Sequence, residues 1–293
     1  MNKVITIISI LLISLTSRVL ADDWGPAGEV ECYSPARKYM LKVQPDSDWP
    51  SKPGHCRATL FHLEPTKEPV WSRNLINNQA PIRVYVADSG EYVLTMDEWG
   101  EVGELPVVIY GKRGELIRVH NTDSLGLADD IGKIKQTVSS YWWNEDSINF
   151  FSPDGELFLM RLNWGKLIVL DLSSGNLVAK NETFYREDLK KDHEEKWKKL
   201  EEYRKEKMAE YVLRLLVSSD PHERKTGALI SGQEKYTNAI PLLRKLLDDK
   251  ESFSTNIPKK WTRVYFIRKA AKGALEAMGQ MVENVVMEEP DTR

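Results

Sequence analysis

Lys166-Leu-Ile-Val-Leu-Asp171-Leu-Ser-Ser-Gly175 and Arg186-Glu-Asp-Leu-Lys-Lys-Asp-His-Glu-Glu-Lys-Trp197 lie a few residues apart and follow different periodicities. The first is a short apolar run that ends in turn residues, a pattern typical of a β-strand and its turn. The second is charged, with apolar residues at roughly helical spacing, which indicates an amphipathic helix. The change falls near Lys180. We therefore predict two architectures in series: a β-rich, antiparallel region over residues 22–183, then helices, beginning with one long charged amphipathic helix over 184–218.

The N-terminus has the pattern of an export signal. Lys3 precedes an apolar run from Val4 to Leu15, and Val19-Leu20-Ala21 offers small residues where a signal peptidase cleaves. The alternative is a membrane anchor, but the run is shorter than the roughly 20 residues that a span needs. We predict a signal peptide over residues 1–21, export to the periplasm or the extracellular space, and no stable membrane insertion after cleavage.

The chain contains two cysteines, Cys32 and Cys56, and predicted export would place them in an oxidising compartment. An even number in an oxidising compartment favours a disulfide between them, and two buried free thiols are the alternative. Neither cysteine has a second Cys or His at ligand spacing, so no metal site is predicted. No cofactor motif is present, and no cofactor is predicted.

Charge is distributed unevenly along the chain. Between Asp22 and Thr183 there are 24 acidic and 16 basic residues, whereas basic residues are in slight excess after Phe184. Nucleic-acid binding needs a basic face. The acidic first half therefore argues against nucleic acid as a partner.

Three segments of the first half are similar to one another. Each is a tight turn followed by an apolar strand: Ser34-Pro-Ala-Arg-Lys-Tyr-Met-Leu-Lys-Val43, Ala87-Asp-Ser-Gly-Glu-Tyr-Val-Leu-Thr-Met96 and Ser152-Pro-Asp-Gly-Glu-Leu-Phe-Leu-Met-Arg161. The third, with Leu170-Asp-Leu-Ser-Ser-Gly175 after it, resembles a blade of a WD40-like or YVTN-like β-propeller. That resemblance implies a propeller-like sheet domain. Three units are fewer than the four to eight that close a propeller, so we expect an incomplete propeller or an antiparallel sheet assembly.

The second of these segments continues to Gly103 and resembles a pattern found in exported bacterial proteins of unknown function, which implies no activity. Its acidic connection, Asp97 to Glu104, contains the best candidates for a small ligand. Asp97, Glu98 and Glu101 could offer carboxylate oxygens to Ca²⁺, although the spacing of a dedicated calcium loop is missing and a solvated loop is the alternative. Trp99 and the pair Trp142-Trp143 could stack on a sugar or peptide, with sheet packing as the alternative.

The second half contains helix pairs. Asp220-Pro-His-Glu223 predicts a helix start, and further helices are predicted over Thr237–Asp249 and Val264–Gly279. Ile240-Pro-Leu-Leu243, Arg224-Lys225 and Arg268-Lys269-Ala-Ala271 resemble HEAT-like repeats, and the two Arg-Lys pairs lie 44 residues apart. The resemblance implies HEAT-like repeats over residues 219–282. It also implies that Arg224 and Arg268 pair with turn aspartates, namely Asp220 and Asp248 or Asp249. An insertion separates the last two helices (252–262), and residues 283–293 are expected to be a disordered tail.

No catalytic motif is present in either half. We therefore predict an exported, non-enzymatic module that binds an unknown protein partner through its sheet and HEAT-like surfaces. The first alternative is a glycan-binding protein with an exposed tryptophan platform, which exposure of the tryptophans would favour. The second is a hydrolase, which would require two carboxylates to converge in one cleft.

Overall fold

The computed structural model describes residues 24–45, 55–138, 140–180, 186–257 and 260–291. The predicted signal peptide, residues 1–21, lies outside the described residues. Antiparallel β-sheets occupy the N-terminal part of the chain and are followed by helices, which confirms the order predicted from the change in periodicity. Among the described residues, no helix combines the length and the apolar character needed to cross a membrane.

The chain divides into two compact units. The first consists of Met1–Trp143, Pro153–Phe158 and Leu170–Leu177, and the second of Asn144–Ser152, Leu159–Val169 and Val178–Arg293. The helices thus belong to one unit with two short segments of the strand-rich half.

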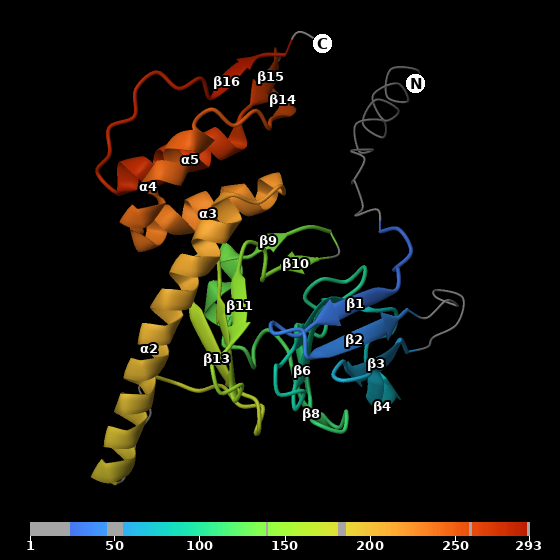
Figure 1. The fold of residues 1–293 in the computed structure, drawn as a ribbon. Helices are drawn as coiled ribbons and strands as arrows, with labels where there is room; N and C mark the ends of the chain where they lie inside the picture. Colours follow the sequence, from blue (N-terminus) through green and yellow to red (C-terminus); the bar gives the residue numbers. More distant parts are fainter. Residues whose placement is uncertain (1–23, 46–54, 139, 181–185, 258–259, 292–293) are drawn as a thin grey trace, which may run out of the picture. The chain divides into compact units, whose positions relative to one another are not determined.

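Two four-stranded antiparallel sheets make up most of the first unit, and in each the strands follow one another in chain order (Figure 1). The first contains β1 (Val30–Tyr33), β2 (Tyr39–Gln44), β3 (Arg57–His62) and β4 (Glu68–Asn74). The second contains β5 (Pro81–Val86), β6 (Val93–Glu98), β7 (Val107–Tyr110) and β8 (Leu116–His120). Hairpins between consecutive strands explain the short turns that the sequence shows.

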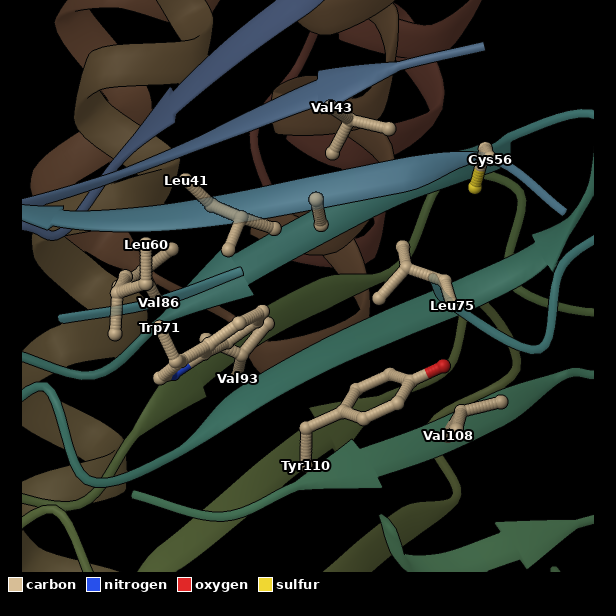
Figure 2. Close-up of a cluster of buried hydrophobic side chains, with 11 residues drawn as sticks. Leu41, Val43, Cys56, Leu60, Trp71, Leu75, Val86, Val93, Val108 and Tyr110 are labelled. Carbon is tan, nitrogen blue, oxygen red and sulfur yellow. The ribbon is translucent and has the colours of Figure 1, made fainter. Parts of the chain in front are cut away.

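The apolar faces of these two sheets form one core. Its side chains point toward one another from β2, β3, β4, β5, β6 and β7 (Figure 2). Trp71 and Tyr110 are its largest members, and the Tyr110 hydroxyl accepts a hydrogen bond from the backbone N–H of Ile76 at 3.0 Å. Every residue of β6 and β7 is buried, as expected for strands that are covered on both faces.

The predicted disulfide between Cys32 and Cys56 is wrong. Cys32, in β1, lies opposite Leu41 of β2, and Leu41 lies opposite Leu60 of β3. Cys56 stands immediately before β3, so β2 separates the two cysteines. Two strand spacings amount to about 9.6 Å, whereas a disulfide requires Cα atoms within about 7 Å. Cys32 is a free thiol, and burial raises its pKa.

The remaining strands of the first half are short. A 3-10 helix, η1 (Ala128–Lys133), precedes the two-stranded pair β9 (Lys135–Gln136) and β10 (Tyr141–Trp142). A three-stranded sheet then contains, in chain order, β11 (Ile148–Phe151), β12 (Leu157–Arg161) and β13 (Leu167–Asp171).

The helices begin with α2 (Glu187–Leu216), one unbroken helix of 30 residues (Figure 1). It is followed by α3 (Pro221–Glu234), the 3-10 helix η2 (Thr237–Ala239), α4 (Ile240–Leu246) and α5 (Phe266–Ala277). Two glycines let α3 approach its neighbours closely. A Cβ on Gly227 would lie 2.9 Å from Leu215 Cβ of α2, and one on Gly232 would lie 2.8 Å from Ala274 Cα of α5.

Two side chains that precede the helices in the sequence but belong to the second unit hold α3. Arg161, whose side chain is 2% exposed, forms an ion pair with Glu234 at 2.6 Å. Asp146 accepts a hydrogen bond from the Thr226 hydroxyl at 2.5 Å and is bridged by Lys225 at 3.4 Å. The second unit therefore depends on residues that precede the helices in the chain.

The residues predicted to stabilise the helix pairs lie at the start of α3, just after α4 and in the first turn of α5. Asp220 caps α3 by accepting from the His222 N–H at 2.8 Å. Arg224 pairs with Asp249 at 2.8 Å, rather than with Asp220. Arg268 donates to the backbone oxygen of the same Asp249 at 2.6 Å. The Asp248 N–H donates to the Lys245 oxygen at 3.3 Å.

The predicted insertion between the last two helices is a hairpin. It contains β14 (Phe253–Ile257) and β15 (Lys260–Val264), and β16 (Glu288–Pro290) pairs with β15. The segment 283–293, for which the sequence predicted a disordered tail, therefore contributes a strand. Arg263 of β15 forms an ion pair with Glu289 of β16 at 3.1 Å, which helps to hold that strand.

Candidate functional site: a tryptophan cluster beside the Asp97 loop

The acidic connection begins within β6, and its first residue turns inward. Asp97 has a left-handed backbone (φ 60°), a conformation that Asp tolerates better than most residues. Its side chain is buried, and Oδ1 accepts hydrogen bonds from Trp143 Nε1 at 2.8 Å and from the Gly103 N–H at 3.0 Å. The Asp97 N–H in turn donates to the Leu105 oxygen at 3.0 Å, so one aspartate closes the whole loop 97–105.

Glu98 is buried as well, and its carboxylate is held by neutral donors. Oε1 accepts from the backbone N–H groups of Gln79 at 2.9 Å and Ala80 at 3.3 Å. Oε2 accepts from the Asn78 N–H at 2.9 Å and from Asn77 Nδ2 at 3.2 Å. The carboxylate thereby fixes the segment that leads into β5.

Burial dominates the protonation of both acids. Desolvation raises the pKa of Asp97 to about 6, and the hydrogen bonds from Trp143 and Gly103 and the charge of Arg83 offset only part of that rise. Desolvation also raises the pKa of Glu98, against the effect of its backbone donors. Asp97 can therefore exchange a proton near neutral pH, whereas an ordinary aspartate is fully ionised there.

Three half-buried tryptophans form a cluster beside this loop, and we call Trp24, Trp99 and Trp142 the tryptophan cluster. Trp24 stacks on Trp142, with ring centroids 6.0 Å apart and planes 9° apart. Trp24 also meets Trp99 edge to face at 5.1 Å. Trp99 Nε1 donates to the Gly25 oxygen at 2.9 Å, which fastens the segment carrying Trp24 to the loop. Residues more than 100 positions apart in the sequence thus meet at one place.

Polar groups surround the cluster. Lys135 Nζ lies 5.9 Å from the centre of the Trp142 ring, and Tyr141, which is 49% exposed, packs on Gly103 of the loop. Glu101 and Glu104 are exposed on the same loop. The surroundings combine aromatic surface with a few charged groups, the usual composition of a small-ligand site.

The six predicted ligand residues play different parts in this arrangement. Trp99 and Trp142 lie in the cluster, Glu101 is exposed beside it, and Asp97, Glu98 and Trp143 are buried beneath the loop. Among the residues that the structure describes, no three acidic, histidine or cysteine side chains gather where they could hold a metal ion. Sequence reasoning missed Trp24, Lys135 and Tyr141, because nothing in the local sequence says that they meet the Asp97 loop.

No protein-family model and no curated protein sequence matches this chain. Among solved structures, the chain is similar to the periplasmic gluconolactonase of Pseudomonas aeruginosa, with 13% identity and a TM-score of 0.33. The match covers 51% of this chain and 41% of the gluconolactonase, so the chain spans about two fifths of that protein.

The solved structure found is that of a gluconolactonase, a hydrolase, and it runs against the prediction of a non-enzymatic module for protein–protein interaction, which we do not retain. The likeness assigns no activity to this chain. An activity for the chain has to come from the chemistry of its own residues.

Proposed function

We propose that the chain binds a sugar ring at the tryptophan cluster. The observation that carries this proposal is the gathering of Trp24, Trp99 and Trp142, each half-buried, from three separate segments of the first unit. An indole face offers a flat apolar surface, and a pyranose offers a matching face of C–H groups. Large aromatic rings in such sites supply most of the contact area at little cost in conformational entropy.

The polar groups around the cluster suit the hydroxyl groups of a sugar. Lys135 and the Tyr141 hydroxyl can donate hydrogen bonds, and the Glu101 carboxylate can accept them. The indole N–H groups of Trp24 and Trp142 have no hydrogen-bond partner among the described residues. Because Trp71, Trp164 and Trp197 share that property elsewhere, the stacking and not the N–H groups carries the proposal.

Trp24 occupies one stacking position on Trp142. Its ring is parallel to that of Trp142, as a bound sugar ring would be. A ligand either adds to the exposed part of the cluster or takes the position of Trp24. Removing the Trp24 ring separates these modes, because it weakens binding in the first and strengthens it in the second.

Titration of the mature protein with cello-oligosaccharides and chito-oligosaccharides, followed by tryptophan fluorescence and calorimetry, tests the proposal. We expect saturable binding that Trp99→Ala and Trp142→Ala each weaken at least tenfold. Trp261→Ala is the matched control, because Trp261 is 58% exposed in β15 and lies outside the cluster. Binding that tolerates both cluster substitutions, or that Trp261→Ala abolishes equally, would contradict the proposal.

Hydrolysis of the bound sugar is a second candidate, and Asp97 is the observation that favours it. A carboxyl group with a pKa of about 6 can act as a general acid near neutral pH. Glu101, exposed on the same loop and paired with Glu98 through the backbone, would be the second carboxylate. Release of reducing ends between pH 5 and 7 tests this, with expected losses of at least 100-fold in Asp97→Asn and Glu101→Gln. Unchanged turnover in Asp97→Asn would exclude this chemistry.

We also infer the finer architecture. The two consecutive four-stranded meanders, which share one core, support propeller-type blades. The succession of α3, α4 and α5 supports HEAT-like repeats. So do the two arginines, because Arg224 forms an ion pair with Asp249 and Arg268 donates to the backbone oxygen of the same residue.

We further infer export to the periplasm or the extracellular space, which Lys3, the apolar run after it and the small residue Ala21 support. N-terminal sequencing of the mature protein should start at Asp22. A mature chain that retains residues 1–21 would contradict this.

A further inference from the structure

A pocket of about 130 Å³ lies in the second unit, between α2 and the connection from α3 to η2. Val212 and Leu213 of α2 form part of its apolar side. Its polar side is formed by two residues of the connection, Lys235 and Tyr236, and by two residues of η2, Thr237 and Asn238. A cavity of roughly 150 Å³ in another protein holds one benzene molecule. This pocket therefore has room for one six-membered ring or a short aliphatic chain.

The polar side results from an abrupt end to α3. Lys235 has left-handed backbone angles (φ 55°, ψ 45°), and its N–H and that of Tyr236 both donate to the Ser231 oxygen. Glycine is the usual residue at such a position, because a side chain there costs roughly 1 kcal/mol. Here a lysine occupies it, and four consecutive polar residues then line one wall.

The polar side of the pocket carries a positive charge on Lys235. Glu234, the residue before Lys235, is already paired with the buried Arg161 at 2.6 Å. Burial and the charge of Glu234 raise the pKa of Tyr236, and the charges of Arg204 and Arg161 oppose that rise. The Nε of Arg204 is buried with no acceptor among the described residues. Lys235 lines the pocket itself, and no acidic side chain among the described residues forms an ion pair with it. Glu201, one turn before Arg204 on α2, is bridged by Lys180 at 2.5 Å.

We propose that this pocket binds a small organic anion, a carboxylate carried on a single ring or a short aliphatic chain. The apolar wall of α2 receives the ring or chain. Lys235 receives the carboxylate, and Arg204 adds favourable potential from the side of Tyr236. The size of the pocket excludes disaccharides, so this site is separate from the proposed sugar site.

Three probes separate charge from shape: benzoate, its neutral analogue benzamide, and acetate, which has the charge without the ring. Amide chemical shifts of the full mature chain report the place of binding. We expect benzoate to shift the amides of residues 235–238 in a saturable way. Benzamide and acetate should each bind at least tenfold more weakly, and 1 M NaCl should weaken benzoate binding.

Two variants locate the site. Lys235→Gln removes the charge and keeps a non-glycine residue at the left-handed backbone position. It should weaken benzoate binding at least tenfold and leave benzamide binding unchanged. Ala209→Leu, from the α2 wall, should fill the pocket and abolish binding of both. Lys198→Gln makes the same charge change on the exposed face of α2, roughly 16 Å along the helix, and should have no effect.

The proposal is overturned if benzoate and benzamide bind equally, if Lys198→Gln weakens benzoate as much as Lys235→Gln does, or if no probe shifts residues 235–238 at 20 mM. Should Ala209→Leu fail to fold, the Lys235→Gln comparison decides alone. Sugar binding at the tryptophan cluster is unaffected by any of these results.

Discussion

The two units bury carboxylates in opposite ways. Asp97 and Glu98, in the first unit, are held by neutral donors: an indole N–H, a side-chain amide and backbone N–H groups. In the second unit, arginines hold the carboxylates, with the buried Arg161 on the partly exposed Glu234 at 2.6 Å and the largely buried Arg224 on Asp249 at 2.8 Å. The first arrangement retains a net negative charge inside the protein, whereas the second neutralises it.

The difference shows what neutral donors can and cannot do. Neutral donors orient a carboxylate as well as a cation does, since backbone N–H groups are fixed in direction. They do not replace the solvation that the charge has lost, and the pKa values of Asp97 and Glu98 both rise for that reason. The loop beside the tryptophan cluster is therefore rigid and at the same time sensitive to pH.

The largest expected effect tests whether Glu98 holds the first unit together. Glu98→Ala leaves the N–H groups of Asn78, Gln79 and Ala80 without their acceptor. Each unpaired buried donor costs about 1–3 kcal/mol, so we expect the free energy of unfolding to fall by about 3–5 kcal/mol. Urea denaturation of the mature protein measures it.

Glu101→Ala is the matched control for Glu98→Ala, because it removes an exposed carboxylate three residues away in the same loop. It should change the free energy of unfolding by no more than about 0.5 kcal/mol. Equal effects of the two substitutions would mean that the backbone donors around Glu98 contribute nothing specific.

The next effect concerns pH. The pKa of Asp97 is raised from 3.8 to about 6 in the folded protein, so between these pH values the folded state binds more protons than the unfolded state. Stability from this group therefore increases as pH falls from 7 to 4, by up to about 3 kcal/mol. Urea midpoints across that range measure the slope.

Asp97→Asn isolates this contribution from all other titrating groups. Asn retains an oxygen that accepts from Trp143 and Gly103, and it tolerates the left-handed backbone. The variant should match or exceed the stability of the parent at pH 7 and show a smaller increase toward pH 4. A variant with the same pH slope as the parent would show that Asp97 is ionised throughout.

A smaller effect is expected in the second unit. Asp249→Asn removes the charge that faces Arg224, where the two side chains are 10% and 14% exposed. Arg224 retains the backbone oxygens of Ser218 and Ser219, so we expect a loss of about 2 kcal/mol. Asp192→Asn, in the exposed pair with Lys196, should cost no more than about 0.5 kcal/mol. Similar losses from both would contradict the importance of burial.

The sequence was sufficient where local periodicity and turn chemistry decide structure. The change of pattern near Lys180 predicted the order of sheets and helices, and Asp220-Pro221 predicted a helix start that the structure contains. Both depend on residues close to one another in the chain. Periodicity also marked β6 as a strand, but it could not show that β6 is covered on both faces.

Contacts between distant residues could not be predicted in the same way. The strand order places β2 between Cys32 and Cys56, so counting cysteines gave the wrong disulfide. Asp97 looked like part of a solvated acidic loop, and only the position of Trp143, 46 residues later, shows why it turns inward. Arg224 found Asp249 rather than the nearer Asp220 for a similar reason, because Asp220 is used as the cap of α3.

The smallest expected effect concerns Trp24, which brings neutral aromatic contact to the charged loop. Trp24→Ala removes the stacking on Trp142 and the edge contact with Trp99, and such aromatic pairs contribute about 0.5–1.5 kcal/mol each. Because Trp24 is only half-buried, we expect the free energy of unfolding to fall by about 1 kcal/mol. Exposure of the Trp142 ring should shift tryptophan emission to longer wavelength, whereas Trp261→Ala should leave the stability unchanged. A Trp24→Ala protein with the melting temperature and the emission maximum of the parent would show that the segment carrying Trp24 does not rest on the cluster, and that Trp142 already presents an open face to a ligand.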